Sequence, residues 1–173
     1  VIAHRLGPHA ALETLLVDKG YRSDAEQNDP VVTHQGVVGR ILRDSAHLST
    51  VLLLTDPNSR IPVRGSTHRT TGILAGGGEN EPLEVLYIPL NAPLEQGEIL
   101  ITSGLAGIFP QDLPAARIIS IERSDISLFQ TVRAEPLLDL KSLEEVLFLK
   151  RSLDVVPNPA PPAAEKGAAA PKQ

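Results

Sequence analysis

An all-β fold is the prediction for this chain, and three observations support it. Short apolar runs rich in β-branched residues recur along the sequence, and Gly, Pro, Asn or Asp stands between nearly every pair of them. Strands spaced by about 8 to 15 residues without long intervening helices favour small barrels or a sandwich over a parallel α/β sheet. Because aromatic residues make up only 3% of the chain, the core must be built mainly from Val, Ile and Leu.

The expected strands are short and numerous, and each is bounded by turn-forming residues. They are Val1–His4, Thr14–Val17, Val31–Thr33, Val37–Leu42, Thr50–Leu54, Pro62–Arg64, Thr71–Leu74, Leu83–Tyr87, Ile99–Thr102, Ala115–Ile121, Phe129–Ala134 and Val146–Leu149. Two connections, Asp56–Ser59 and Gly76–Asn80, contain the residues that tight turns prefer, and both are predicted to be hairpin-like.

The segment that follows Pro136 carries a conflicting pattern. Its apolar residues fall three and four positions apart, which is the spacing of an amphipathic helix. They are Leu137, Leu140, Leu143, Val146 and Leu147. Taken alone, this spacing predicts a helix over the segment.

Charge and composition restrict the class of partner. The chain has 16 Lys and Arg against 21 Asp and Glu, a net charge of −5, which argues against a nucleic-acid surface or a polybasic membrane patch. Proteins are therefore the expected partners. The absence of Cys excludes disulfides, thiolate nucleophiles and thiolate metal ligands.

Two stretches resemble one family closely. They read GVVGRILRDSAHLSTVLLLTDPNSRIP at Gly36–Pro62 and GEILITSGLAGIFPQDLP at Gly97–Pro114. Both are similar to the extracytoplasmic part of the MreC family of bacterial rod-shape-determining proteins. The resemblance covers roughly residues 1–150. For the segment after Pro136 it implies a turn at Asp139–Ser142 and a closing strand at Val146–Leu149 instead of a helix, and this is the prediction retained.

The resemblance implies two small β-barrel domains in tandem, one inserted into the other. Residues 37–113 would form the inserted barrel, and residues 1–36 together with 114–150 the discontinuous one, whose final strand would return to the first. The Pro- and Ala-rich residues 151–173 are predicted from their composition to be a flexible tail, since such a segment buries too little apolar surface to offset its ordering entropy.

The implied function is that of a non-enzymatic periplasmic scaffold. It would organise the cell-wall elongation machinery, and so peptidoglycan synthesis and rod cell shape, by self-association and by binding a class B penicillin-binding transpeptidase, MreD and RodZ. The chain begins Val1-Ile2-Ala3, and we expect it to be an excised part of a protein anchored to the cytoplasmic membrane by a preceding segment.

A chymotrypsin-like serine hydrolase on paired β-barrels is the alternative. His47, Asp56 and Ser103 follow the order of the catalytic residues in those proteases. However, His47 and Asp56 are too close in sequence for that fold, and no nucleophile motif surrounds Ser103. A serine in a Thr-Ser-Gly turn is more typical of local bonding to the backbone.

No cofactor or metal site is predicted, because the histidines lack ligand spacing and the Gly76–Gly78 triplet lacks the Lys of a phosphate-binding loop. The candidate partner-binding residues are Leu105, Ile108 and Phe109, which lie in a glycine-flanked loop without alternation. The competing interpretation places Phe109 in the core.

Overall fold

The computed structural model describes residues 3–4, 12–124 and 126–150, and within them it is all-β, as predicted. The predicted strands are confirmed to within a few residues at their ends. They are β1 (Ala3–His4), β2 (Thr14–Val17), β3 (Pro30–Thr33), β4 (Gly36–Asp44), β5 (Ser49–Leu53), β6 (Arg60–Gly65), β7 (Thr71–Ala75), β8 (Leu83–Leu86), β9 (Ile99–Thr102), β10 (Pro114–Glu122), β11 (Thr131–Pro136) and β12 (Leu147–Phe148). Two 3₁₀ turns, η1 (Tyr21–Ser23) and η2 (Leu105–Gly107), complete the elements. The predicted tail lies outside the described residues.

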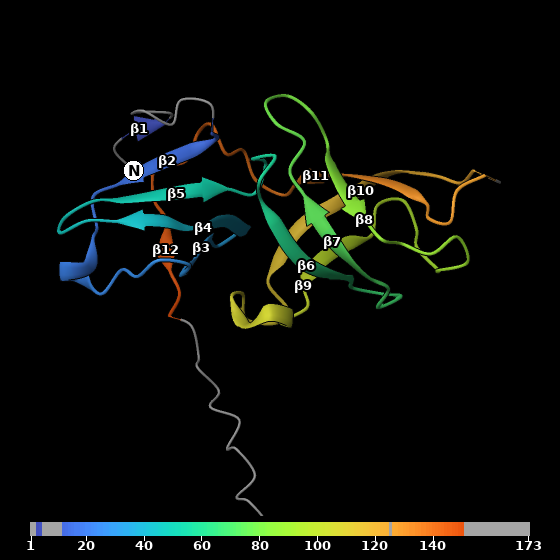
Figure 1. Ribbon diagram of the computed structural model, residues 1–173, viewed down its shortest axis with the longest axis horizontal. Coiled ribbons are helices and arrows are strands. Elements are labelled where there is room, and N and C mark those ends of the chain that lie inside the picture. Colours follow the sequence, from blue (N-terminus) through green and yellow to red (C-terminus); the bar gives the residue numbers. More distant parts are fainter. Residues whose placement is uncertain (1–2, 5–11, 125, 151–173) are drawn as a thin grey trace, which may run out of the picture.

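The strands form two antiparallel units that lie side by side (Figure 1). The first unit, sheet A, has the order β1-β2-β5-β4-β3-β12, and the second is a closed barrel with the order β10-β11-β8-β7-β6-β9. The alternation of buried and exposed residues along β8 and β11 follows the period of two that a barrel wall requires. One predicted barrel is therefore confirmed.

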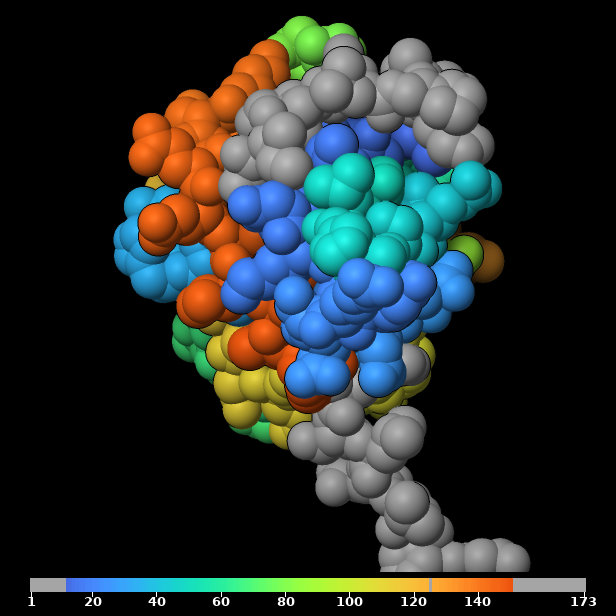
Figure 2. All heavy atoms as spheres, turned by 90° about the vertical axis from the view of Figure 1, so that its left-hand side faces the viewer, coloured from blue at the N-terminus to red at the C-terminus, as the bar shows by residue number. Residues whose placement is uncertain are grey.

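Sheet A is open, so the prediction of a second closed barrel was wrong for the described residues. The last strand, β12, does not return to β1 but pairs with β3, through Leu147 opposite Val32 and Phe148 opposite Val31. The reason lies in the meander of β3, β4 and β5, which leaves one side of β3 unpaired for β12 to occupy. β1 and β12 are then the two edges of the sheet. Figure 2 shows the orange-red segment that leads to β12 lying beside the blue strands.

The strands are also distributed between the two units differently from the prediction, which assigned residues 37–113 to one barrel. β4 and β5 lie within that range but pair in sheet A, and β10 and β11 lie beyond it but close the barrel. Short connections hold β3, β4 and β5 in one sheet, because sequential antiparallel strands joined by tight turns pair with each other. The chain changes sheet at Asp56–Ser59, which is therefore not a hairpin, whereas Gly76–Asn80 does join the paired strands β7 and β8.

A continuous aliphatic core fills both units. The run Leu52–Leu54 is buried, as its continuous apolar character predicts. β4 lies against β10, where Gly36 has φ of 153° and a Cβ in its place would come within 2.5 Å of the Pro114 carbonyl oxygen. Glycine at this position therefore allows the backbones of sheet A and the barrel to approach closely.

The loop that precedes β3 uses positive φ without glycine. Asp24 and Asn28 have φ of 60° and 70°, which lie in the left-handed region. Asn and Asp tolerate this region because their short polar side chains bond to nearby backbone.

Asp56 fixes the point at which the chain leaves sheet A. Its carboxylate is fully buried and accepts hydrogen bonds from the Glu13 N–H at 2.7 Å, the Asn58 N–H at 2.7 Å and the Asn58 Nδ2 at 3.0 Å. The Thr55 hydroxyl donates to the Glu13 carboxylate beside it. The residue that precedes β2 is thereby joined to the crossing between the two units.

An ion pair ties two loops at one end of the barrel. The Glu98 carboxylate, whose side chain is 2% exposed, accepts hydrogen bonds at 2.9 Å from the backbone N–H groups of Thr67 and His68 and lies 2.9 Å from the His68 Nδ1. Burial raises the pKa of Glu98, but the hydrogen bonds from His68, Thr67 and Glu95 outweigh it, and the pKa lies below its usual 4.5. The hydrogen bond to Glu98 raises the pKa of His68 above 6.5, against the smaller opposing effect of burial.

We expect Asp56→Ala to lower the free energy of unfolding by about 3 kcal/mol or more, because it leaves two backbone N–H groups without their charged acceptor in the interior. Asp56→Asn should lower the free energy of unfolding by about 1.5 kcal/mol or more, since the new amide nitrogen would face an N–H donor in place of a carboxylate oxygen. Urea unfolding followed by circular dichroism measures both. The matched control is Asp18→Ala at an exposed position, expected within about 0.5 kcal/mol of wild type. Equal stabilities of Asp56→Ala and Asp18→Ala would contradict the role of Asp56.

The His68–Glu98 pair makes stability depend on pH in a defined direction. Because the folded-state pKa of His68 is raised, its contribution is fully present below pH 6.5 and is lost as the pH rises through the folded-state pKa. We expect the gap in unfolding free energy between wild type and His68→Gln to be widest below pH 6.5 and to narrow above it. His34→Gln, at an exposed turn position, is the control. A gap that widens with rising pH would contradict the assignment.

Candidate functional site

The η2 turn carries the residues that the sequence singled out. Leu105 is 61% exposed, Ile108 is half-buried, and Phe109 is only 4% exposed within the core. Of the two interpretations left open for Phe109, the structure supports core packing. The turn is shaped by positive φ at Gly104, Ala106 and Gly107. Leu105, with Ile108 beside it, is thus the part of this loop that a partner could contact.

A second group of exposed apolar residues is formed by the connection between β10 and β11, which points away from sheet A at the right-hand edge of Figure 1, and by the residue that follows β8. We call it the barrel tip and define it as Tyr87, Ile126, Leu128 and Phe129, all of which are exposed. Ile126 and Leu128 are 98% and 82% exposed. Clustered apolar exposure of this kind is typical of interaction sites.

The tip has a defined shape. The rings of Tyr87 and Phe129 meet edge to face, with centroids 6.0 Å apart and planes at 86°. Tyr87 has φ of 65°, which is unusual for a bulky side chain and is found where surrounding contacts hold it. The connection is held by Ser127, whose hydroxyl donates to the Phe129 carbonyl at 2.8 Å.

The sequence patterns did not lead to a prediction of this site. The available signal was the presence of three apolar residues, Ile126, Leu128 and Phe129, in a turn, where polar residues are usual.

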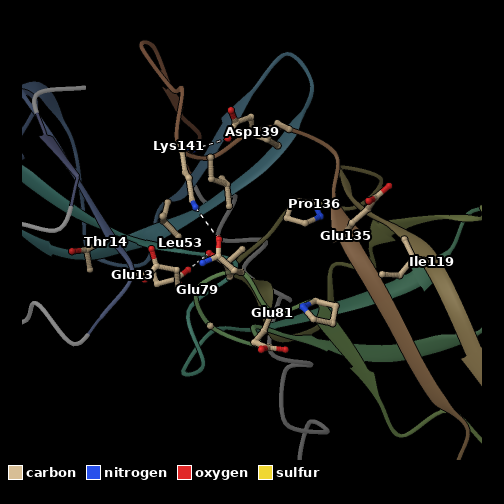
Figure 3. Close-up of a pocket in the computed structure, with 16 residues that line it drawn as sticks. Glu13, Thr14, Leu53, Glu79, Glu81, Ile119, Glu135, Pro136, Asp139 and Lys141 are labelled. Atoms are coloured by element: carbon tan, nitrogen blue, oxygen red, sulfur yellow. Dashed lines mark hydrogen bonds between the residues drawn. The ribbon is translucent and has the colours of Figure 1, made fainter.

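A groove of about 770 Å³ lies between sheet A, the barrel and the segment that joins β11 to β12 (Figure 3). We call it the junction groove. Its apolar lining includes Leu53, Ile119, Pro136, Leu138 and Leu140.

The rim of the junction groove is acidic. Five carboxylates line it, from Glu13, Glu79, Glu81, Glu135 and Asp139. Lys141 is the one cationic side chain among the lining residues, and its Nζ donates to the Asn80 Oδ1 at 3.0 Å across the groove.

The serine hydrolase alternative finds no support in the geometry. The His47 ring contacts Arg22 at 3.4 Å, Asp56 binds backbone and Asn58, and Ser103 Oγ accepts from the Leu105 N–H at 3.4 Å. None of the three side chains hydrogen-bonds to another of them. Ser103 is thus the local turn residue that its Thr-Ser-Gly context predicted.

No group of three or more potential metal ligands occurs within residues 12–124 and 126–150. No helix among the described elements has the length and hydropathy needed to cross a bilayer.

Known proteins share this arrangement. The MreC protein of Haemophilus influenzae is 34% identical over 137 residues, which cover 79% of this chain and 39% of that protein. The chain thus spans about two fifths of the length of this relative. The crystal structure of MreC from Pseudomonas aeruginosa has a TM-score of 0.79 at 28% identity, covering 84% of this chain and 94% of the other.

Two further structures share the fold at lower identity. One is MreC of Helicobacter pylori in a complex with penicillin-binding protein PBP2, with a TM-score of 0.59, 24% identity and coverage of 71% and 78% of the two chains. The other is described as the major periplasmic domain from the cell shape-determining filament MreC, with a TM-score of 0.68, 23% identity and coverage of 84% and 90%. The family model "Rod shape-determining protein MreC, barrel core" matches residues 1–150, and the chain therefore belongs to the MreC family.

Proposed function

We propose that this chain is the docking part of a non-enzymatic periplasmic scaffold that organises the cell-wall elongation machinery and thereby maintains rod shape. Membership of the MreC family over both β units carries the proposal. The location is supported by the MreC relative described as a periplasmic domain, and the scaffold would be tethered to the cytoplasmic membrane by a segment of the full protein. The surface chemistry agrees, because exposed aliphatic and aromatic side chains suit protein contacts.

A class B penicillin-binding transpeptidase is the proposed first partner, and the complex of the H. pylori relative with PBP2 supports it. We assign the barrel tip as the principal contact and Leu105 with Ile108 as a second one. Exposed apolar side chains such as Leu128 and Phe129 can serve as anchors that fill pockets of a partner. By binding one conformation of the transpeptidase more tightly, the scaffold would raise the population of that conformation.

The remaining proposed partners are MreD, RodZ and further copies of the scaffold. Two short edge strands, β1 and β12, leave backbone groups at the borders of sheet A, and Leu147 on β12 is exposed. Edge pairing of this kind is a route to self-association. We also propose that the barrel, residues 60–136, is a module inserted into sheet A, because the chain leaves the sheet after β5 and rejoins it at β12.

Replacement of Ile126 and Leu128 together by Ser should weaken binding to a class B transpeptidase ectodomain by about tenfold or more, since it removes two apolar anchors. Surface plasmon resonance with immobilised ectodomain measures the loss. The side chains are exposed, so the fold should be retained, and circular dichroism checks this. Leu48→Ser, at an exposed position in the turn between β4 and β5, is the control and should bind like wild type. Unchanged binding by the tip variant would remove the tip as the main contact.

The scaffold and hydrolase interpretations predict different reactivity of the Ser103 hydroxyl toward a serine-directed probe. Wild-type protein should show no labelling by a serine-reactive fluorophosphonate probe, because the Ser103 hydroxyl has no adjacent base. Labelling is read by in-gel fluorescence, with a known serine hydrolase as the positive control. Stoichiometric labelling that disappears in Ser103→Ala would overturn the non-enzymatic assignment.

A further inference from the structure

We propose that the junction groove binds a segment of a partner protein that carries both cationic and apolar side chains. This inference rests on the proposed scaffolding function and adds the chemistry of a second kind of partner contact. It is distinct from the barrel tip, which presents apolar side chains on a convex end of the barrel.

Charge complementarity defines the occupant. Glu79, Glu81, Glu135 and Asp139 are all exposed at the rim, and they come from two different segments, the β7–β8 hairpin and the region that follows β11. Figure 3 shows Glu79 and Glu81 on the barrel side, across the groove from Asp139 and Lys141. Carboxylates gathered around a concave site with low-dielectric walls strengthen one another's attraction for a cation. A Lys or Arg side chain that enters the groove therefore meets acceptors on more than one side.

The apolar lining restricts the occupant further. Leu53 and Leu138 form part of the lining, and Ile119 and Pro136 are half-buried there. A free metal ion would gain nothing from these surfaces, whereas an aliphatic side chain that covers the accessible parts of Ile119 and Pro136 removes apolar area from water. Concave sites with apolar walls and a few polar groups are the usual form of ligand sites. A peptide segment that alternates basic and apolar residues matches both properties.

Lys141 shows how such a cation can sit. Lys141 is itself a lining residue, and its Nζ donates to Asn80, joining the segment after β11 to the β7–β8 hairpin. Both side chains are exposed, and an exposed contact of this type contributes little to stability. An incoming basic residue can therefore replace the Lys141 ammonium without disturbing the fold.

The same charges disfavour other classes of occupant. Phosphates of nucleic acids and anionic lipid headgroups would be repelled by the five carboxylates. A second copy of the chain carries a net charge of −5 and has no net attraction for the acidic rim, whereas the proposed edge pairing of β1 or β12 does not involve the groove.

The test uses a fluorescein-labelled octapeptide of alternating Lys and Leu and the complete 173-residue chain, with fluorescence anisotropy at low salt as the readout. Glu81→Gln/Glu135→Gln should weaken binding by roughly three- to tenfold, and Lys141→Ala should tighten it by roughly twofold. Glu135 forms an exposed ion pair with Arg117 at 3.7 Å, and such pairs contribute little to folding. Neutralisation of Glu135 should therefore leave the free energy of unfolding nearly unchanged. The matched control, Glu84→Gln/Glu122→Gln, removes the same charge from exposed barrel positions outside the groove and should bind like wild type.

Two further peptides separate the contributions. Exchange of Leu for Ser should weaken binding by at least about fivefold, and exchange of Lys for Glu should abolish it. Equal affinity of the Lys and Glu peptides, or equal effects of the rim and control variants, would overturn the proposal. A third result would also overturn the proposal: no peptide binds, the wild-type chain is a dimer in sedimentation equilibrium, and the rim variant is a monomer. The occupant of the groove would then be a second copy of the chain. Since no transpeptidase is present, each of these negative results leaves the proposed scaffolding function standing.

Discussion

The buried carboxylate of Asp56 is the constraint on which the arrangement of this molecule depends. A chain that passes from one β unit to another exposes backbone donors that neither sheet can satisfy, and in the interior such donors are costly. Asp56 accepts two of them, from Glu13 and Asn58, and thus holds the entry to β2 against the exit from β5. The crossing between sheet A and the barrel is thereby held by hydrogen bonds to one carboxylate.

The contact between sheet A and the barrel also shapes the surface of the molecule. The junction groove exists only where sheet A, the β7–β8 hairpin and the segment after β11 meet, so its shape follows from the close contact that Gly36 permits beside Pro114. A groove between two mobile units would spend much of its binding energy on ordering them. A scaffold gains from rigidity because each bound partner is then held in a defined orientation.

The chemistry of the described residues fits binding better than reaction. The carboxylates and imidazoles that elsewhere serve catalysis are engaged in holding turns and loops here, Asp56 by backbone donors and Glu98 by His68 and its neighbours. The exposed features are instead apolar anchors at the barrel tip and an acidic rim at the groove. Association through such surfaces is governed by shape and charge, in agreement with the proposed scaffolding function.

The sequence by itself determined most of the strands, because period-two patterns and turn residues are local properties. The closing strand near Leu147 has a helix-like spacing, and its prediction needed the family resemblance. It also determined the aliphatic core, including Leu52–Leu54. Only the tertiary structure decided which strands share a sheet, that β12 pairs with β3, and that Phe109 is buried while Leu128 is exposed. Strand pairing and the gathering of Glu79 with Asp139 depend on contacts between residues far apart in the chain, and a single sequence carries no local record of them.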